Sequence, residues 1–183
     1  MEPRTSLTDP LEIAVVSAGP RYGRVGITFC PGKCDRRAFS GPWARDLAID
    51  LDAIQKWGAA AVVTLIAQEE LILLRVEPLG EEVRRRGMSW FHLPIADVST
   101  PDEAFERNWI EASEALRAHL RDGRDVLVHC RGGLGRAGMI AASLLVELGT
   151  EPDVAIRRVR DMRPGAIETD EQEDYVRNLR TAA

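Results

Sequence analysis

Residues 129–138 read HCRGGLGRAG and bring together one thiol, two guanidinium groups and four glycines. The glycines leave backbone N–H groups uncovered and permit conformations that other residues resist. Arg136 adds a planar fork that can hold two oxygens of a phosphoryl group. The spacing predicts a cradle for a dianion. The loop N–H groups come from Arg131, Gly132, Gly133, Leu134 and Gly135, and Cys130 lies beneath the anion.

The elements on either side of this stretch favour chemistry at Cys130. Residues 125–130 read DVLVHC, which is typical of a buried strand, and residues 137–149 form a strongly apolar helical pattern. A loop at a helix N-terminus feels the positive end of the helix dipole and points N–H groups at an anion. The same field favours a thiolate, so Cys130 is predicted to be a nucleophile that forms a phosphocysteine intermediate.

Other interpretations of the stretch compete with catalysis: a purely structural glycine-rich turn between strand and helix, a nucleotide-binding loop, a dinucleotide-binding loop, or a buried structural cysteine. The stretch lacks the Gly-Lys-Ser/Thr ending of a nucleotide-binding loop. A dinucleotide fingerprint would require an acidic residue about 20 positions after a first strand, and no such arrangement supports it. A free cysteine is often only a small buried hydrophobe. Because Arg136 follows Cys130 across an intervening glycine-rich run, catalysis is the favoured interpretation.

Apolar runs alternate with amphipathic ones along the chain, which predicts an α/β fold with one central, mostly parallel sheet flanked by helices. In such sheets ligands bind at the carboxyl ends of the strands. Thr100 is expected to cap the helix that follows it, with Pro101 in the first turn. The predicted strands are 11–16, 24–30, 60–67, 89–96 and 125–130; the predicted helices are 44–58, pieces of 68–87 broken around Pro78 and Gly80, 101–123, 137–149, 152–163 and 170–182.

The composition is that of a globular chain, with 183 residues, 45% hydrophobic residues and a net charge of -5. We expect a single domain over residues 1–183. The negative charge argues against nucleic acid and anionic membranes as partners. No apolar run approaches the roughly 20 residues of a membrane helix, and no signal peptide is visible, so a cytoplasmic location is expected. Cys30 and Cys34 are expected to be reduced thiols, and neither a metal nor a cofactor is predicted.

The stretch HCRGGLGRAG resembles the HCxxGxxR signature of the cysteine-dependent protein tyrosine and dual-specificity phosphatases. Residues 92–102, HLPIADVSTPD, and residues 165–176, GAIETDEQEDYV, are similar to segments of the kinase-associated group, that of cyclin-dependent kinase inhibitor 3. CPGKCDRR resembles the N-terminal part of that group. The resemblance covers roughly residues 25–180 and implies a phosphotyrosine-phosphatase-like fold.

The resemblance also assigns roles outside the cysteine loop. Asp97 matches the general acid, with Asp102 as a competitor that could instead be a first-turn helix carboxylate. His129 is expected to hydrogen-bond the loop backbone, and Gln172 matches a position associated with the hydrolytic water. Family members usually carry Ser or Thr directly after the arginine, where this chain has Ala137, and slower breakdown of the phosphocysteine is expected.

Taken together, the residues predict a metal-independent cysteine phosphatase, and the resemblance implies that it acts on phosphotyrosine and phosphoserine or phosphothreonine in proteins. The expected partner is a phosphoprotein substrate. Whether this substrate is a protein kinase or a protein that a kinase phosphorylates is left open. The alternatives are a phosphatase for a phosphoinositide, nucleotide or RNA 5′ phosphate, a low-turnover phospho-binding module, and sulfur transfer of the rhodanese kind.

Overall fold

The structure is a computed structural model that describes residues 2–182. A five-stranded sheet forms the centre of the molecule, with its strands in the order β1-β2-β7-β5-β6. β1 pairs with β2 in antiparallel fashion, whereas the other neighbouring pairs are parallel. The predicted mostly parallel sheet is therefore confirmed. The strands are β1 Ala14–Ser17, β2 Arg24–Thr28, β5 Ala59–Thr64, β6 Ser89–His92 and β7 Asp125–His129.

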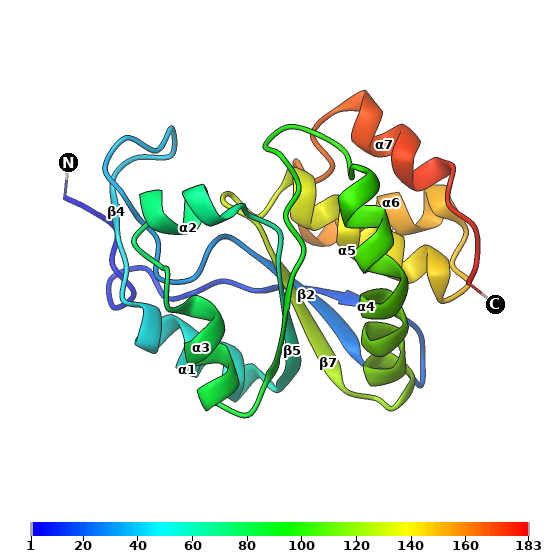
Figure 1. The fold of residues 1–183 in the computed structure, drawn as a ribbon, viewed down its shortest axis with the longest axis horizontal. Coiled ribbons are helices and arrows are strands. Elements are labelled where there is room, and N and C mark those ends of the chain that lie inside the picture. The colour runs from blue at the N-terminus through cyan, green and yellow to red at the C-terminus, as the bar shows by residue number, and fades with distance from the viewer. Residues whose placement is uncertain (1, 183) are drawn as a thin grey trace.

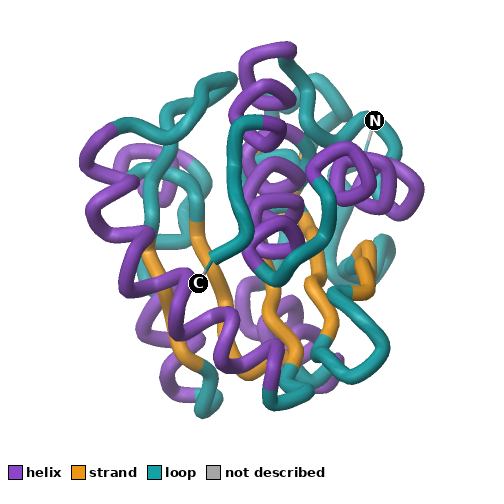
Figure 2. Tube along the Cα trace, turned by 90° about the vertical axis from the view of Figure 1, so that its right-hand side faces the viewer, coloured by secondary structure: helices purple, strands orange, loops and turns teal. Residues whose placement is uncertain are grey.

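Helices cover both faces of this sheet (Figure 1). α1 and α3 pack against β5 and β6 on one face, while α4, α5 and α6 pack against the other, with α7 against α5 and α6. Figure 2, viewed from the side of that second group, shows helices lying along the strands. None of the helices within residues 2–182 combines the length and the apolar character needed to cross a bilayer. The helices are α1 Leu47–Trp57, α2 Gln68–Leu73, α3 Leu79–Arg85, α4 Glu103–Arg121, α5 Gly135–Glu147, α6 Pro152–Met162 and α7 Asp170–Arg177.

The helix α5 is buried along its whole length. Its sequence is apolar on nearly every side, as expected for a helix enclosed on all faces. It lies between the strands β2 and β7 and the helices α4, α6 and α7. This packing fixes the position of its amino end, which follows the cysteine loop directly.

The four parallel strands end at the same level of the sheet. Thr28, His129, Thr64 and His92 are partners in one row across β2, β7, β5 and β6. The loops after these strands therefore leave from one edge, which is where ligands bind in open α/β sheets.

Several local predictions are wrong at the level of element boundaries. α4 begins at Glu103 because Asp102, not Thr100, is its N-cap: the Asp102 Oδ1 accepts the Phe105 N–H at 2.8 Å.

The helical break lies between α2 and α3, and Gly80 falls inside α3, where a side chain would collide with the Trp90 ring. The predicted loop after β2 contains a short ribbon, β3 Cys34–Asp35 and β4 Trp43–Ala44. The strand predicted at 11–16 is observed at Ala14–Ser17.

Candidate active site

The predicted cradle forms the turn from β7 into α5. Gly133 has a φ of 70°, and a side chain there would lie within 2.5 Å of the Thr28 and Phe29 backbone. Only glycine tolerates both conditions. The Gly133 N–H donates to the Cys130 Sγ at 3.2 Å, so one loop amide already faces the sulfur.

Arg136 is held in place by a carboxylate that the sequence analysis did not single out. Its side chain is only 2% exposed, and its two terminal nitrogens donate to the two oxygens of Glu70 at 2.7 and 3.0 Å. A further bond runs from Nη1 to the Ile95 carbonyl at 3.0 Å. Burial opposes the charge of Glu70, but the bonds from Arg136 hold the pKa of that carboxyl below its usual range. Several glutamates surround this position in the sequence, so only the fold singles out Glu70.

Asp97 follows β6 and reaches the same guanidinium. Its Oδ1 lies 2.9 Å from the Arg136 Nη2, and its carboxylate remains 61% exposed to solvent. The next residue, Val98, has a φ of 55°, a conformation that β-branched residues rarely adopt, and its N–H donates to the Asp97 Oδ1 at 3.1 Å. The competing carboxylate, Asp102, is occupied as the cap of α4. The structure therefore brings Asp97 into the site and leaves Asp102 outside it.

His129 supports the loop from inside the core. The Trp90 Nε1 donates to the Thr64 hydroxyl at 2.8 Å, and that hydroxyl lies 2.8 Å from the His129 Nε2. The other ring nitrogen, Nδ1, faces the Cys130 carbonyl at 3.3 Å. All polar atoms are satisfied when the hydroxyl donates to Nε2 and Nδ1–H donates to the carbonyl. Burial lowers the pKa of His129 to about 4, so the ring is neutral near pH 7.

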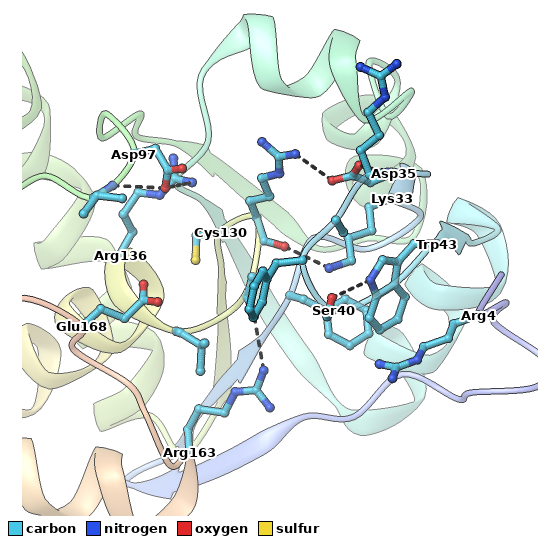
Figure 3. A pocket seen from close by; sticks show the side chains of 18 of the residues that line it. Arg4, Lys33, Asp35, Ser40, Trp43, Asp97, Cys130, Arg136, Arg163 and Glu168 are labelled. Atoms are coloured by element: carbon cyan, nitrogen blue, oxygen red, sulfur yellow. Dashed lines mark hydrogen bonds and ion pairs between the residues drawn. The ribbon is translucent and has the colours of Figure 1, made fainter. Parts of the chain in front are cut away.

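A cavity of about 610 Å³ opens above Cys130 (Figure 3). Aromatic rings and basic side chains face the loop from the opposite side of the cavity. Among the predicted site residues, Cys130, Arg131, Gly132, Leu134, Arg136 and Asp97 line the cavity. The other side is formed in part by Phe29, Lys33 and Trp43, while Glu168 and Arg163 line the cavity beside and below the loop.

Gln172 lies beside the site but not in the cavity wall. It is fully buried, its Nε2 donates to the Ser99 carbonyl at 3.2 Å, and its Oε1 accepts the Glu168 N–H at 3.0 Å. These two bonds hold the amide in place, and the side chain does not line the cavity. Glu168 lines the cavity instead, and its carboxylate points toward Cys130 in Figure 3.

Of the remaining sequence candidates, Arg131 lines the cavity, whereas Cys30 and Cys34 do not. The guanidinium of Arg131 pairs with Asp35 at 2.7 Å, and this pairing anchors the ribbon β3–β4 to the cysteine loop. Cys30 and Cys34 are free thiols, as expected. Within residues 2–182, no three His, Cys, Asp or Glu side chains gather as a metal site would require.

The sheet, the cysteine loop and the buried arginine define a domain of the phosphotyrosine-phosphatase-like class. Residues 45–176 match a family described as the Swiss Army Knife protein, DSP-PTPase phosphatase domain. The chain belongs to this dual-specificity phosphatase family.

Individual relatives agree with this assignment. The chain is 35% identical over 139 residues to cyclin-dependent kinase inhibitor 3 of Homo sapiens, covering 74% of this chain and 64% of that protein. It therefore spans a little less than two thirds of this relative's length. A crystal structure of kinase-associated phosphatase, with its catalytic-site cysteine replaced by serine, superposes with a TM-score of 0.79 and 31% identity over 92% of this chain and 93% of the other. Tk-PTP in its active form gives a TM-score of 0.66 and 28% identity, covering 91% and 95% of the two chains.

The buried neutral His129 predicts a loss of stability in acid. Its pKa of about 4 in the folded state lies below the ordinary value near 6.5, so the unfolded chain binds the proton first as the pH falls. The contribution is present above pH 6.5 and is lost toward pH 4, by on the order of 3 kcal/mol. We expect His129→Gln to flatten this part of the pH dependence of the unfolding free energy, measured with urea. An unchanged slope in that variant would contradict the assignment.

Proposed function

We propose that this domain is a single, metal-independent phosphatase unit that hydrolyses phosphomonoesters on proteins, with Cys130 as the nucleophile. The observation that carries the proposal is the Gly133 N–H aimed at the Cys130 Sγ, with the Arg136 guanidinium in the wall of the same cavity. A thiolate, an array of loop amides and a preorganised guanidinium are what phosphoryl transfer to sulfur requires. The amides of residues 131–136 share the binding of the phosphate oxygens with Arg136.

In the first step the Cys130 thiolate attacks phosphorus. The S–P bond forms while the bond from phosphorus to the ester oxygen breaks, and its electron pair goes to that oxygen. The Asp97 carboxyl gives its proton to the leaving oxygen, so an alcohol or phenol departs. A bound phosphate competes with Asp97 for Arg136.

In the second step water attacks the phosphocysteine. The water oxygen bonds to phosphorus, the S–P bond breaks, and its electron pair returns to Cys130 as thiolate. The Asp97 carboxylate takes the proton of the water, and inorganic phosphate leaves. His129 stays neutral and holds the Cys130 carbonyl throughout.

We propose phosphotyrosine and phosphoserine or phosphothreonine in proteins as the substrate class, with a phosphorylated kinase or a kinase substrate as the partner. The family membership and the similarity to a kinase-associated phosphatase support this choice. The cavity of about 610 Å³ extends from Cys130 to Phe29, Asp35 and Trp43, and we propose that the peptide around the phosphorylated residue occupies this part.

Replacement of the nucleophile tests the reaction directly. With EDTA present, we expect the wild-type protein to hydrolyse p-nitrophenyl phosphate and Cys130→Ser to lose at least about a thousandfold in kcat. The variant should still bind tungstate, because the loop amides and Arg136 remain. An inactive wild-type protein that binds tungstate would instead support a phospho-binding module without turnover.

The two neighbouring carboxylates allow a matched test of the acid. We expect Asp97→Asn to lower kcat about 10²–10⁴-fold with phosphoserine peptides, whose alkoxide leaving group requires a proton. Asp102→Asn should leave kcat within about twofold, because asparagine is also a good N-cap. The opposite ranking of the two variants would transfer the role to Asp102.

Ala137 follows Arg136 inside the buried start of α5 and has no hydroxyl to donate to the departing thiolate. One hydrogen bond to a charged group is worth about 1.5–3 kcal/mol, which corresponds to roughly one to two decades of rate. We expect rapid-mixing experiments to show a burst of p-nitrophenol in the wild-type protein. Ala137→Ser should shrink the burst and raise the steady rate; no change in either quantity would show that other groups assist the second step.

A further inference from the structure

The carbonyl groups of residues 130–133 each have a donor from outside the loop, so they are turned outward from the loop toward these donors. The bonds are Cys130 O with the His129 Nδ1 at 3.3 Å, Arg131 O with the Cys30 N–H at 3.3 Å and the Lys33 Nζ at 3.4 Å, Gly132 O with the Arg163 Nη2 at 3.3 Å, and Gly133 O with the Arg163 Nε at 3.0 Å.

The direction of each carbonyl decides the direction of the next N–H. A trans peptide is planar, and its C=O and N–H point to opposite sides. An outward carbonyl on Arg131, Gly132 or Gly133 therefore turns the following N–H inward. The Gly133 N–H, which follows the Gly132 carbonyl, does donate inward to the Cys130 Sγ.

Arg163 holds two consecutive carbonyls from one side. It follows the last turn of α6, and its planar guanidinium donates through two different nitrogens to Gly132 and Gly133. A planar fork fixes two acceptors relative to each other, which a single ammonium cannot do. In Figure 3 its side chain rises toward the loop from below the cavity.

Lys33 approaches from a different side (Figure 3). Only 5% of the residue is exposed, and its Nζ lies 4.7 Å from the centre of the Phe29 ring and 4.2 Å from that of Trp43. The two ring faces and the Arg131 carbonyl offset the cost of burying an ammonium. Lys33 directly precedes β3 and is far from Arg131 in the sequence. The sequence therefore gave no indication of the contact between Lys33 and the Arg131 carbonyl.

The charge of Lys33 depends on pH near neutrality. Burial is the main cause that lowers its pKa to about 8, and Arg45 acts in the same direction. Cys30, Asp35 and Cys130 oppose the shift. The side chain is therefore an ammonium below about pH 8 and a neutral amine above it.

We propose that Lys33 and Arg163 are positioning residues that keep the loop carbonyls turned outward and so keep the amides aimed at a bound oxyanion. The proposal rests on the proposed function for its role in catalysis, but its test is the binding of tungstate. Neither side chain needs to touch the substrate, because each acts through the peptide groups of the loop.

Arg163 is tested with a charge-matched control on the same helix, the exposed Arg158. By calorimetry on the full chain, we expect Arg163→Met to weaken tungstate binding about tenfold or more, and Arg158→Met less than about twofold. Arg163→Lys keeps the charge but not the fork, so its affinity should recover only in part. Full recovery in Arg163→Lys, or equal losses in the two methionine variants, would overturn positioning in favour of simple charge attraction. Thermal unfolding of each variant verifies that it is folded.

Lys33 is tested through pH in a Cys130→Ser background, in which serine replaces the nucleophile. Tungstate affinity should fall between about pH 7 and about pH 9 when Lys33 is present, as the ammonium loses its proton. Lys33→Met should bind more weakly and with a flatter pH dependence. Identical profiles in the two proteins would overturn the role of Lys33. Unchanged tungstate binding in all the Arg163 and Lys33 variants would defeat this proposal alone, whereas a wild-type chain that binds no tungstate would defeat the proposed function with it.

Discussion

A planar peptide cannot turn its carbonyl and its N–H to the same side, and the loop from Cys130 to Gly135 is built around this constraint. To face an anion with amides, the loop must send its carbonyls into the protein, where each needs a donor. The donors come from His129, Lys33, Arg163 and the backbone of Cys30. The cradle is therefore a property of its surroundings as much as of its glycines.

The same logic governs the buried charges. Arg136 is almost fully enclosed, and a lone guanidinium there would be costly, so Glu70 accompanies it from α2, the helix that follows β5. Asp97 arrives from the loop after β6, and Lys33 from the chain after β2. Each of the four parallel strands thus contributes to the site at its carboxyl end. A row of paired residues across the sheet sets the level from which these loops depart.

Arg136 has one partly buried and one exposed carboxylate partner, so one of its two ion pairs is open to replacement. In the structure Arg136 has both Glu70 and Asp97 as partners, but only Asp97 is largely exposed. An incoming phosphate can replace Asp97 on the guanidinium while Glu70 keeps the arginine in position. The positive φ of Val98 beside Asp97 shows that the acid loop adopts a costly backbone conformation in the cavity wall.

The sequence by itself determined the features that are local: the thiol, the arginine and the glycines lie within ten residues, and the alternation of strands and helices predicts the mostly parallel sheet. The resemblance to a family added Asp97. Only the tertiary structure decided that Glu70, Lys33, Arg163 and Glu168 join the site, since each meets the loop across roughly 30 or more intervening residues. It also decided that Asp102 caps a helix. Side chains of one type are interchangeable in a sequence pattern, and long-range packing alone selects which of them reaches the loop.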